Sequence, residues 1–196
     1  MENECVTINR APVLALWGAA VAERQGHARE AALTLGKCMA GLNAQSKGRR
    51  IGIFKVPEST EGGGKPKKAG LGEDFWVKVC GRPVPVKETP EGERAVIEDR
   101  PLDPAQVQKY LEKSFGADLP RVREAMQALA GAYTPDELED ESFALYEKFR
   151  PQIEAGKRGW GQKGVLDLAL LREMARRPAQ PGLFTTEPPR HGGQEE

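Results

Sequence analysis

Apolar residues near the start of the chain recur with the period of an α-helix. From Pro12 they follow the i, i+3, i+4, i+7 spacing that gathers side chains on one face, which predicts a first helix ending near Gly26. Proline fits the first helical turn because the N–H that it lacks would have no partner there. A second apolar face begins at Ala28, after a short link. We therefore expect an antiparallel helical hairpin over residues 11–46.

Residues 51–99 lose this helical period. FWVKV alternates in the manner of a strand, IGIFKV is another short candidate, and a TPEG turn separates two further strand-like stretches. Pro83 and Pro85 cannot donate to a ladder, so we expect the strand that holds them at a sheet edge. Residues 58–72 are rich in glycine and lysine and have almost nothing to bury, which predicts a flexible loop inside a small antiparallel β-insert.

Helical patterns return over residues 103–177. Asp103 and Asp118 stand where the N-caps of two successive helices are expected, because their carboxylates can accept hydrogen bonds from first-turn N–H groups. TPDE, beginning at Thr134, is a capping box with proline at the first helical position, and it opens a third helix. A last helix is expected over residues 165–177.

The order of these elements predicts a mostly helical α+β protein, with an N-terminal helical hairpin, a small antiparallel β-insert and a C-terminal helical group. We expect residues 1–177 to form one compact domain and the polar, proline-rich residues 178–196 to be disordered. Small residues at Gly36, Ala40 and Gly41 leave room for another backbone to pack closely against the second helix.

Composition agrees with a compact core that carries long loops. Glycine and proline number 22 and 15 among 196 residues, whereas hydrophobic residues make up only 39%. No run approaches the ~20 apolar residues of a membrane span, and the widely spaced cysteines indicate neither a disulfide framework nor a zinc site. We therefore expect a cytoplasmic protein with reduced thiols and no membrane association. With only 2 histidines and no catalytic motif, the sequence favours a protein that is not an enzyme and needs no metal or cofactor.

Charge is unevenly distributed, although the formal net charge is zero. Residues 47–68 hold seven basic side chains against two acidic ones, residues 156–177 hold six against two, and residues 133–154 are mainly acidic. Basic segments attract phosphate groups. We therefore predict a binding protein that contacts nucleic acid or another phosphate-bearing partner through the two basic segments. The candidate contact residues are Ser46, Lys47, Arg49, Arg50, Lys157, Arg158 and Lys163.

The sequence GWGQKG at residues 159–164 matches the Gly-x-Gly-x-x-Gly pattern of dinucleotide-binding loops. That chemistry requires a strand before the glycines and a second strand beyond the following helix, and neither is predicted here. We expect instead that Trp160 packs on the helical core, with glycines that let the backbone turn around the ring. Lys157, Arg158 and Lys163 would then stand just before a helix N-terminus, where an anion is favoured.

Other interpretations of the same residues stay open. The basic residues at the end of the second helix can be surface partners of the helix dipole, without any ligand. The chain can also be a protein-interaction or self-association module with no nucleic-acid role, which the small-residue stripe and the segregated charges would suit, and it would then form a homo-oligomer. An enzyme that acts on a phosphorylated small molecule has no motif in its support.

Overall fold

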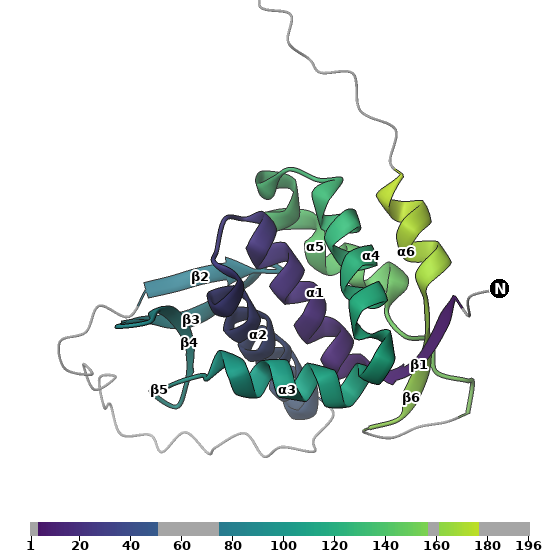
Figure 1. Ribbon diagram of the computed structural model, residues 1–196. Coiled ribbons are helices and arrows are strands. Elements are labelled where there is room, and N and C mark those ends of the chain that lie inside the picture. Colours follow the sequence, from purple (N-terminus) through teal and green to yellow (C-terminus); the bar gives the residue numbers. More distant parts are fainter. Residues whose placement is uncertain (1–3, 51–74, 157–160, 177–196) are drawn as a thin grey trace, which may run out of the picture.

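The predicted architecture is confirmed by the computed structural model, an α+β fold with an N-terminal helical hairpin, an antiparallel β-insert and a C-terminal helical group (Figure 1). The structure describes three stretches of the chain: residues 4–50, 75–156 and 161–176. The side chains at 47–50 are not described. Three predicted features lie outside the described residues: the strand at 51–56, the loop at 58–72 and the tail at 178–196.

Helices make up both ends of the fold, and most of the strands lie between them. The helices are α1 (Arg10–Arg24), α2 (Arg29–Arg50), α3 (Pro104–Phe115), α4 (Leu119–Gly131), α5 (Pro135–Phe149) and α6 (Leu168–Ala175). The strands are β1 (Cys5–Asn9), β2 (Phe75–Val79), β3 (Arg82–Thr89), β4 (Gly92–Ile97), β5 (Arg100–Pro101) and β6 (Lys163–Asp167). The β-insert is thus one sheet, and β1 and β6 form a separate pair.

The helical hairpin occupies the centre of the molecule. α1 is buried along its length from Pro12 to Ala22, and α2, α3, α4 and α5 surround it (Figure 1). α1 begins at Arg10, two residues before the predicted Pro12, because the Asn9 side chain accepts a hydrogen bond from the first turn and caps the helix. α2 also exceeds its predicted end and continues to Arg50.

Gly36 sets the distance between the two hairpin helices. A Cβ atom on this residue would collide with the Ala15 carbonyl oxygen and lie 2.5 Å from the Ala19 nitrogen, so the two backbones are in direct contact. Gly36 and Ala40 are both buried, whereas a Cβ on Gly41 would meet nothing within 4 Å. The small-residue stripe considered for self-association is therefore used, at its first two positions, for packing within the chain.

The prediction that Pro83 and Pro85 lie on an edge strand is wrong, because they belong to β3, which lies between β2 and β4. Register explains how the sheet accepts them. β4 pairs with β3 only from Val86 onward, so Pro83 and Pro85 precede that ladder. They stand opposite Lys78 and Trp76 of β2, and their missing N–H groups point toward the side of β3 that has no partner at that level.

Two of the three predicted N-caps are confirmed. The Asp103 carboxylate accepts a hydrogen bond from the first turn of α3, and Thr134 forms the predicted capping box at the start of α5. Asp118 is the exception, since its side chain makes no capping bond. A 3₁₀ turn over Gly116–Asp118 runs directly into α4, and Asp118 pairs with Arg121 at 2.6 Å instead.

The antiparallel pair of β1 with β6 is a feature that the sequence pattern did not predict. Its register joins Asn9 to Lys163 and places Val6 opposite Leu166, both of which are buried. The helix expected over residues 165–177 accordingly begins only at Leu168, after the strand. β6 was missed because a short strand depends on its partner, and that partner lies at the other end of the chain.

One hydrophobic core joins the helices, the sheet and the β1–β6 pair. Trp17 is completely buried at its centre, where its indole N–H donates to the Ser142 carbonyl at 2.8 Å and its ring meets Phe149 edge to face. Burial raises the pKa of the Cys38 thiol to about 11 and that of the Cys80 thiol to about 12. In the described part of the chain, no helix combines the length and the apolar character that crossing a membrane requires.

Candidate functional site

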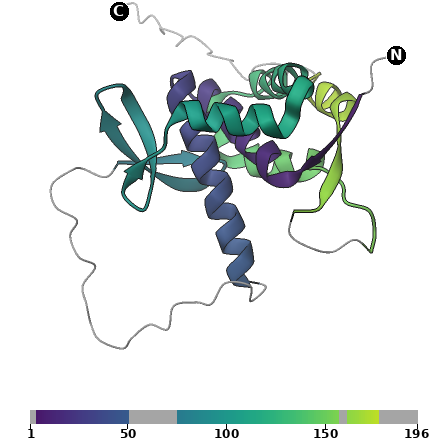
Figure 2. The same cartoon turned by 60° about the horizontal axis from the view of Figure 1, so that its bottom comes forward.

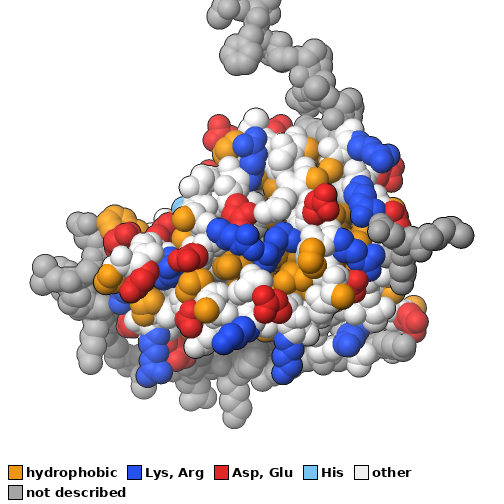
Figure 3. All heavy atoms as spheres, in the orientation of Figure 1, with side chains coloured by type: hydrophobic (Ala, Val, Ile, Leu, Met, Phe, Trp, Pro, Cys, Tyr) orange, Lys and Arg blue, Asp and Glu red, His pale blue; other side chains and the backbone are white. Residues whose placement is uncertain are grey.

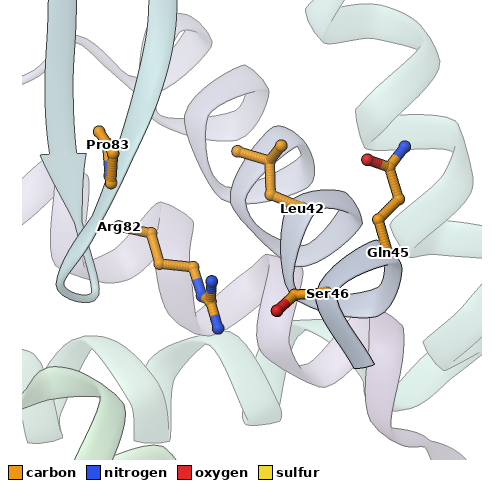
Figure 4. A pocket seen from close by; sticks show the side chains of 5 residues that line it. All are labelled: Leu42, Gln45, Ser46, Arg82 and Pro83. Carbon is orange, nitrogen blue, oxygen red and sulfur yellow. The ribbon is translucent and has the colours of Figure 1, made fainter. Parts of the chain in front are cut away.

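An open pocket of about 330 Å³ lies between the C-terminal turns of α2 and the start of β3. Its lining residues come from both elements: Leu42, Gln45, Ser46, Arg82 and Pro83 (Figure 4). Figure 2 shows that the end of α2 extends beyond the body of the molecule, so the pocket stands where this helix projects. Ser46, one of the predicted contact residues, thus shares a cavity with residues from a distant part of the sequence.

A tight turn brings Arg82 to this pocket. Cys80 and Gly81 connect β2 to β3 with φ angles of 48° and 71°, which a two-residue hairpin turn requires. The Cys80 side chain is buried and anchors the turn in the core. Arg82, the first residue of β3, therefore projects from a short and well-supported hairpin.

Among the described residues, Arg82 has only neutral partners. Its Nη2 atom donates to the Asn43 side-chain oxygen at 3.1 Å, and its guanidinium carbon lies 5.9 Å from the centre of the Phe143 ring. No described carboxylate comes within ion-pair distance of it, whereas Arg94 of the same sheet pairs with Glu30 at 2.7 Å. A guanidinium carries five N–H donors, and the hydrogen bond to Asn43 uses one of them.

The remaining predicted contacts of the first basic segment follow Ser46 on the same helix. Lys47, Arg49 and Arg50 belong to the last turns of α2, and their side chains lie outside the described part of the structure. Positions 47 and 50 come four residues after Asn43 and Ser46, respectively, a spacing that places them on one helix face. Positions 47 and 50 therefore continue the face of α2 that borders Arg82.

Lys163 has a different setting from the one expected. It is the first residue of β6, and α6 begins only at Leu168, where the side chain of Asp167 already caps the helix. The predicted position just before a helix N-terminus is therefore wrong, and an acidic group occupies the N-cap. Lys157 and Arg158 lie outside the described residues, as does Trp160, so their predicted roles stay predictions.

Two arginines that the sequence did not single out lie near Lys163. Arg10 follows Asn9, the register partner of Lys163. Its Nε atom donates a hydrogen bond to the backbone carbonyl oxygen of Pro151, the residue after Arg150, at 2.9 Å. Burial lowers the pKa of Arg10, and the neighbouring Arg150 guanidinium lowers it further. Among the described residues, the one acid that pairs with any of these three cations is Glu147, 3.8 Å from Arg150.

The ends of two elements that carry predicted contact residues lie on the same side of the molecule. The C-terminal end of α2 and the start of β6 are both at its lower side in Figure 1, and they stay there after the rotation in Figure 2. Ser46 and Arg82 lie at the first of these ends, and Arg10, Arg150 and Lys163 lie at the second.

The face that α3 and α4 present has a mixed character. Basic, acidic and apolar side chains are interspersed there (Figure 3). A shallow groove of about 430 Å³ between these helices contains Arg123, whose pKa is lowered by burial and then by the Arg29 guanidinium, while Glu23 and Glu112 oppose that shift. Since both signs of charge meet in this groove, it offers no net attraction to an anion.

Fold and pocket together define an α+β protein with an open, arginine-lined pocket beside a projecting basic helix. Comparisons of the chain with protein-family models, with curated proteins and with solved structures find no match. Among the described residues, no group of three or more His, Cys, Asp or Glu side chains is placed to hold a metal ion. We therefore infer a function from the geometry and charge of the pocket itself.

Proposed function

We propose that the protein is a non-enzymatic binding protein whose pocket between α2 and β3 holds a phosphate group of its partner, nucleic acid being the first candidate. The observation that carries the proposal is the state of Arg82, which is held in place by neutral groups and has no described carboxylate as a partner. Ser46 stands on the opposite wall of the same pocket (Figure 4).

Arginine is suited to this role because its planar guanidinium can donate two parallel hydrogen bonds to a phosphate. Asn43 and Phe143 orient the Arg82 side chain before any ligand arrives, which lowers the entropy that binding must overcome. The hydroxyl of Ser46 can add a further donor. The pocket is open and shallow rather than enclosed, which suits one phosphate of a chain better than a small molecule that must be surrounded.

The dipole of α2 does not account for this arrangement. Cations in the last turn of a helix are favoured by about 0.3–1 kcal/mol each, and that effect alone could explain the basic residues at 47, 49 and 50. Arg82 belongs to a strand and bonds to a side-chain amide rather than to the terminal carbonyls of α2. Its position therefore favours a ligand over simple capping.

Salt dependence gives the first test. We expect the full chain to bind a labelled oligonucleotide with an affinity that falls steeply as salt rises, because each bound phosphate releases counterions. R82A and the triple variant K47A/R49A/R50A should weaken binding and reduce the slope of log K against log salt, by about one for each phosphate that the variant no longer neutralises. Fluorescence anisotropy at several salt concentrations measures both quantities.

R121A is the matched control for this test. It also removes one arginine, but Arg121 pairs with Asp118 and lies on α4, away from the pocket. Its affinity should stay at the wild-type value. Binding that does not weaken between low and moderate salt, or that survives the triple substitution unchanged, would contradict the proposal.

Self-association or binding of another protein is the alternative function. It has less support, because Gly36 and Ala40, which motivated it, are buried inside the chain. Sedimentation of the full chain over a range of concentrations tests self-association directly. A concentration-dependent dimer, together with no binding of nucleic acid, would favour the alternative.

A further inference from the structure

Two neighbouring aromatic side chains at the start of β2 are exposed. Trp76 is 63% accessible and Phe75 is 56% accessible, while Trp17 in the core is completely buried. Consecutive strand residues point to opposite faces, so the two rings do not form one patch, and Trp76 is the exposed ring on the face that carries Pro83 and Pro85. β2 is an edge strand among the described strands, so these residues lie at the border of the sheet.

The register of β2 and β3 connects Trp76 to the pocket. Trp76 stands opposite Pro85 and Lys78 stands opposite Pro83, and residues directly opposite each other share a sheet face. Pro83, which lines the pocket, is therefore the diagonal neighbour of Trp76, a relation that corresponds to about 7–8 Å between backbones. Arg82 stands opposite Val79 and its side chain alternates to the other sheet face, so Trp76 adjoins the pocket through Pro83, on the exposed face of the hairpin.

We propose that the partner is a single-stranded nucleic acid, with one base stacked on Trp76 and a phosphate of a neighbouring nucleotide in the pocket of Arg82 and Ser46. The inference rests on the proposed function and specifies its substrate class. Every base has a flat π-face that an exposed indole can cover, so stacking needs no particular sequence. In a duplex these faces are already stacked on one another, and only base edges are accessible.

Charges around the sheet indicate on which side the strand would run. Lys78 lies at 3.0 Å from Glu139 and 3.7 Å from Asp140, so two carboxylates of α5 share one cation next to Trp76. A phosphate on that side would meet a net negative charge. On the side of Arg82 no described carboxylate pairs with the cation, and the basic end of α2 follows. Beyond the pocket, the phosphates therefore run along the end of α2 and avoid Glu139 and Asp140, which pair with Lys78 opposite Pro83.

The experiment compares an oligothymidylate of about ten nucleotides with a duplex of the same length, using the full chain at several salt concentrations. We expect the single strand to bind more tightly than the duplex. W76A should weaken binding of the single strand about tenfold at every salt concentration without changing the salt slope, because stacking is not ionic. R82A, in contrast, should reduce the slope. W76F, which keeps a stacking ring, should retain most of the affinity.

Two further measurements make the comparison specific. I97A truncates another exposed apolar residue, at the far end of β4, and should bind as the wild type does. The chain holds 3 tryptophans, so quenching is measured in a W160F background. There the single strand should quench the fluorescence of Trp76, and the further change W76F should abolish the quenching, because Trp17 is shielded in the core. Unfolding curves of each variant check that the fold is intact.

The outcomes separate this inference from the function on which it rests. If W76A binds the single strand as tightly as the wild type while R82A still reduces the salt slope, stacking is overturned and the phosphate site stands. Equal affinity for duplex and single strand overturns the single-strand specificity in the same way. Loss of self-association in W76A, with unchanged affinity for nucleic acid, would assign the exposed Trp76 ring to a second copy of the chain. No binding of either nucleic acid by the wild type overturns both proposals.

Discussion

Gly36 is the residue at which the helical hairpin leaves no room for a side chain. The sequence shows it as one of three small residues with equal claims to a close approach. The structure distinguishes the two glycines, because Gly36 faces backbone atoms of α1, while the space beside Gly41 is open. A glycine in a helix costs stability unless such a contact requires it.

Substitution of these two glycines should therefore have opposite effects on stability. G36A would force α1 and α2 apart, because the clash involves backbone atoms that cannot rotate away, and we expect a loss of more than about 2 kcal/mol. G41A should be neutral or stabilising by up to about 1 kcal/mol, since alanine is the better helix former. Denaturant unfolding of both variants measures the difference. Equal stability of the two would show that the hairpin can separate at no cost.

Helix starts in this chain show how far local chemistry decides an element. Asp103 and Thr134 both cap their helices as the sequence predicts, and the chain before each of them is extended. Asp118 has the same chemistry but sits in helical geometry after a 3₁₀ turn, so its carboxylate points to Arg121. An N-cap needs a suitable side chain and also a backbone that enters the helix from outside.

The contrast between these caps is testable by truncation. T134A removes both hydrogen bonds of the capping box that involve the threonine side chain, and we expect a loss of about 1 kcal/mol of unfolding free energy. D118A removes a partly exposed ion pair and should change stability by less than about 0.5 kcal/mol. Thermal or chemical unfolding gives both values. A larger loss in D118A than in T134A would mean that the 3₁₀ turn depends on Asp118.

At the scale of the whole molecule, the β1–β6 pair brings the two ends of the described chain together. It joins the segment before α1 to the segment before α6, and Arg172 of α6 also pairs with Glu4 at 2.7 Å. Leu166 is completely buried in the common core, while its neighbour Val165 is 44% exposed on the other face of the strand. The β1–β6 pair therefore packs into the same hydrophobic core as the helices.

Leu166 should accordingly matter for the whole fold rather than for one strand. We expect L166A to lower the unfolding free energy by about 2–5 kcal/mol in a single cooperative transition. V165A, which truncates the exposed neighbour, should cost less than about 1 kcal/mol. Unfolding followed by circular dichroism and by tryptophan fluorescence shows whether both signals change in the same transition. An early transition that leaves the Trp17 environment unchanged would show that β1 and β6 open separately from the helices.

The sequence by itself determined the helical hairpin, the hairpins of the β-insert, two helix caps and the fold class. These features depend on local periodicity, on turn residues and on side chains that bond within a few positions. It also predicted Ser46 and the basic end of α2 as candidate contacts, because runs of like charge are visible without a structure.

Only the tertiary structure decided the position of β3 inside the sheet, the pairing of β1 with β6, and the pocket that forms the candidate site. Arg82 has no sequence signal as a ligand residue, since its partners Asn43 and Phe143 are distant in the chain. The same is true of Arg10 and Arg150 beside Lys163. Strand partners, pockets and unpaired charges depend on contacts between distant residues. Those contacts arise only when the common core fixes all the elements together, so no local pattern contains them.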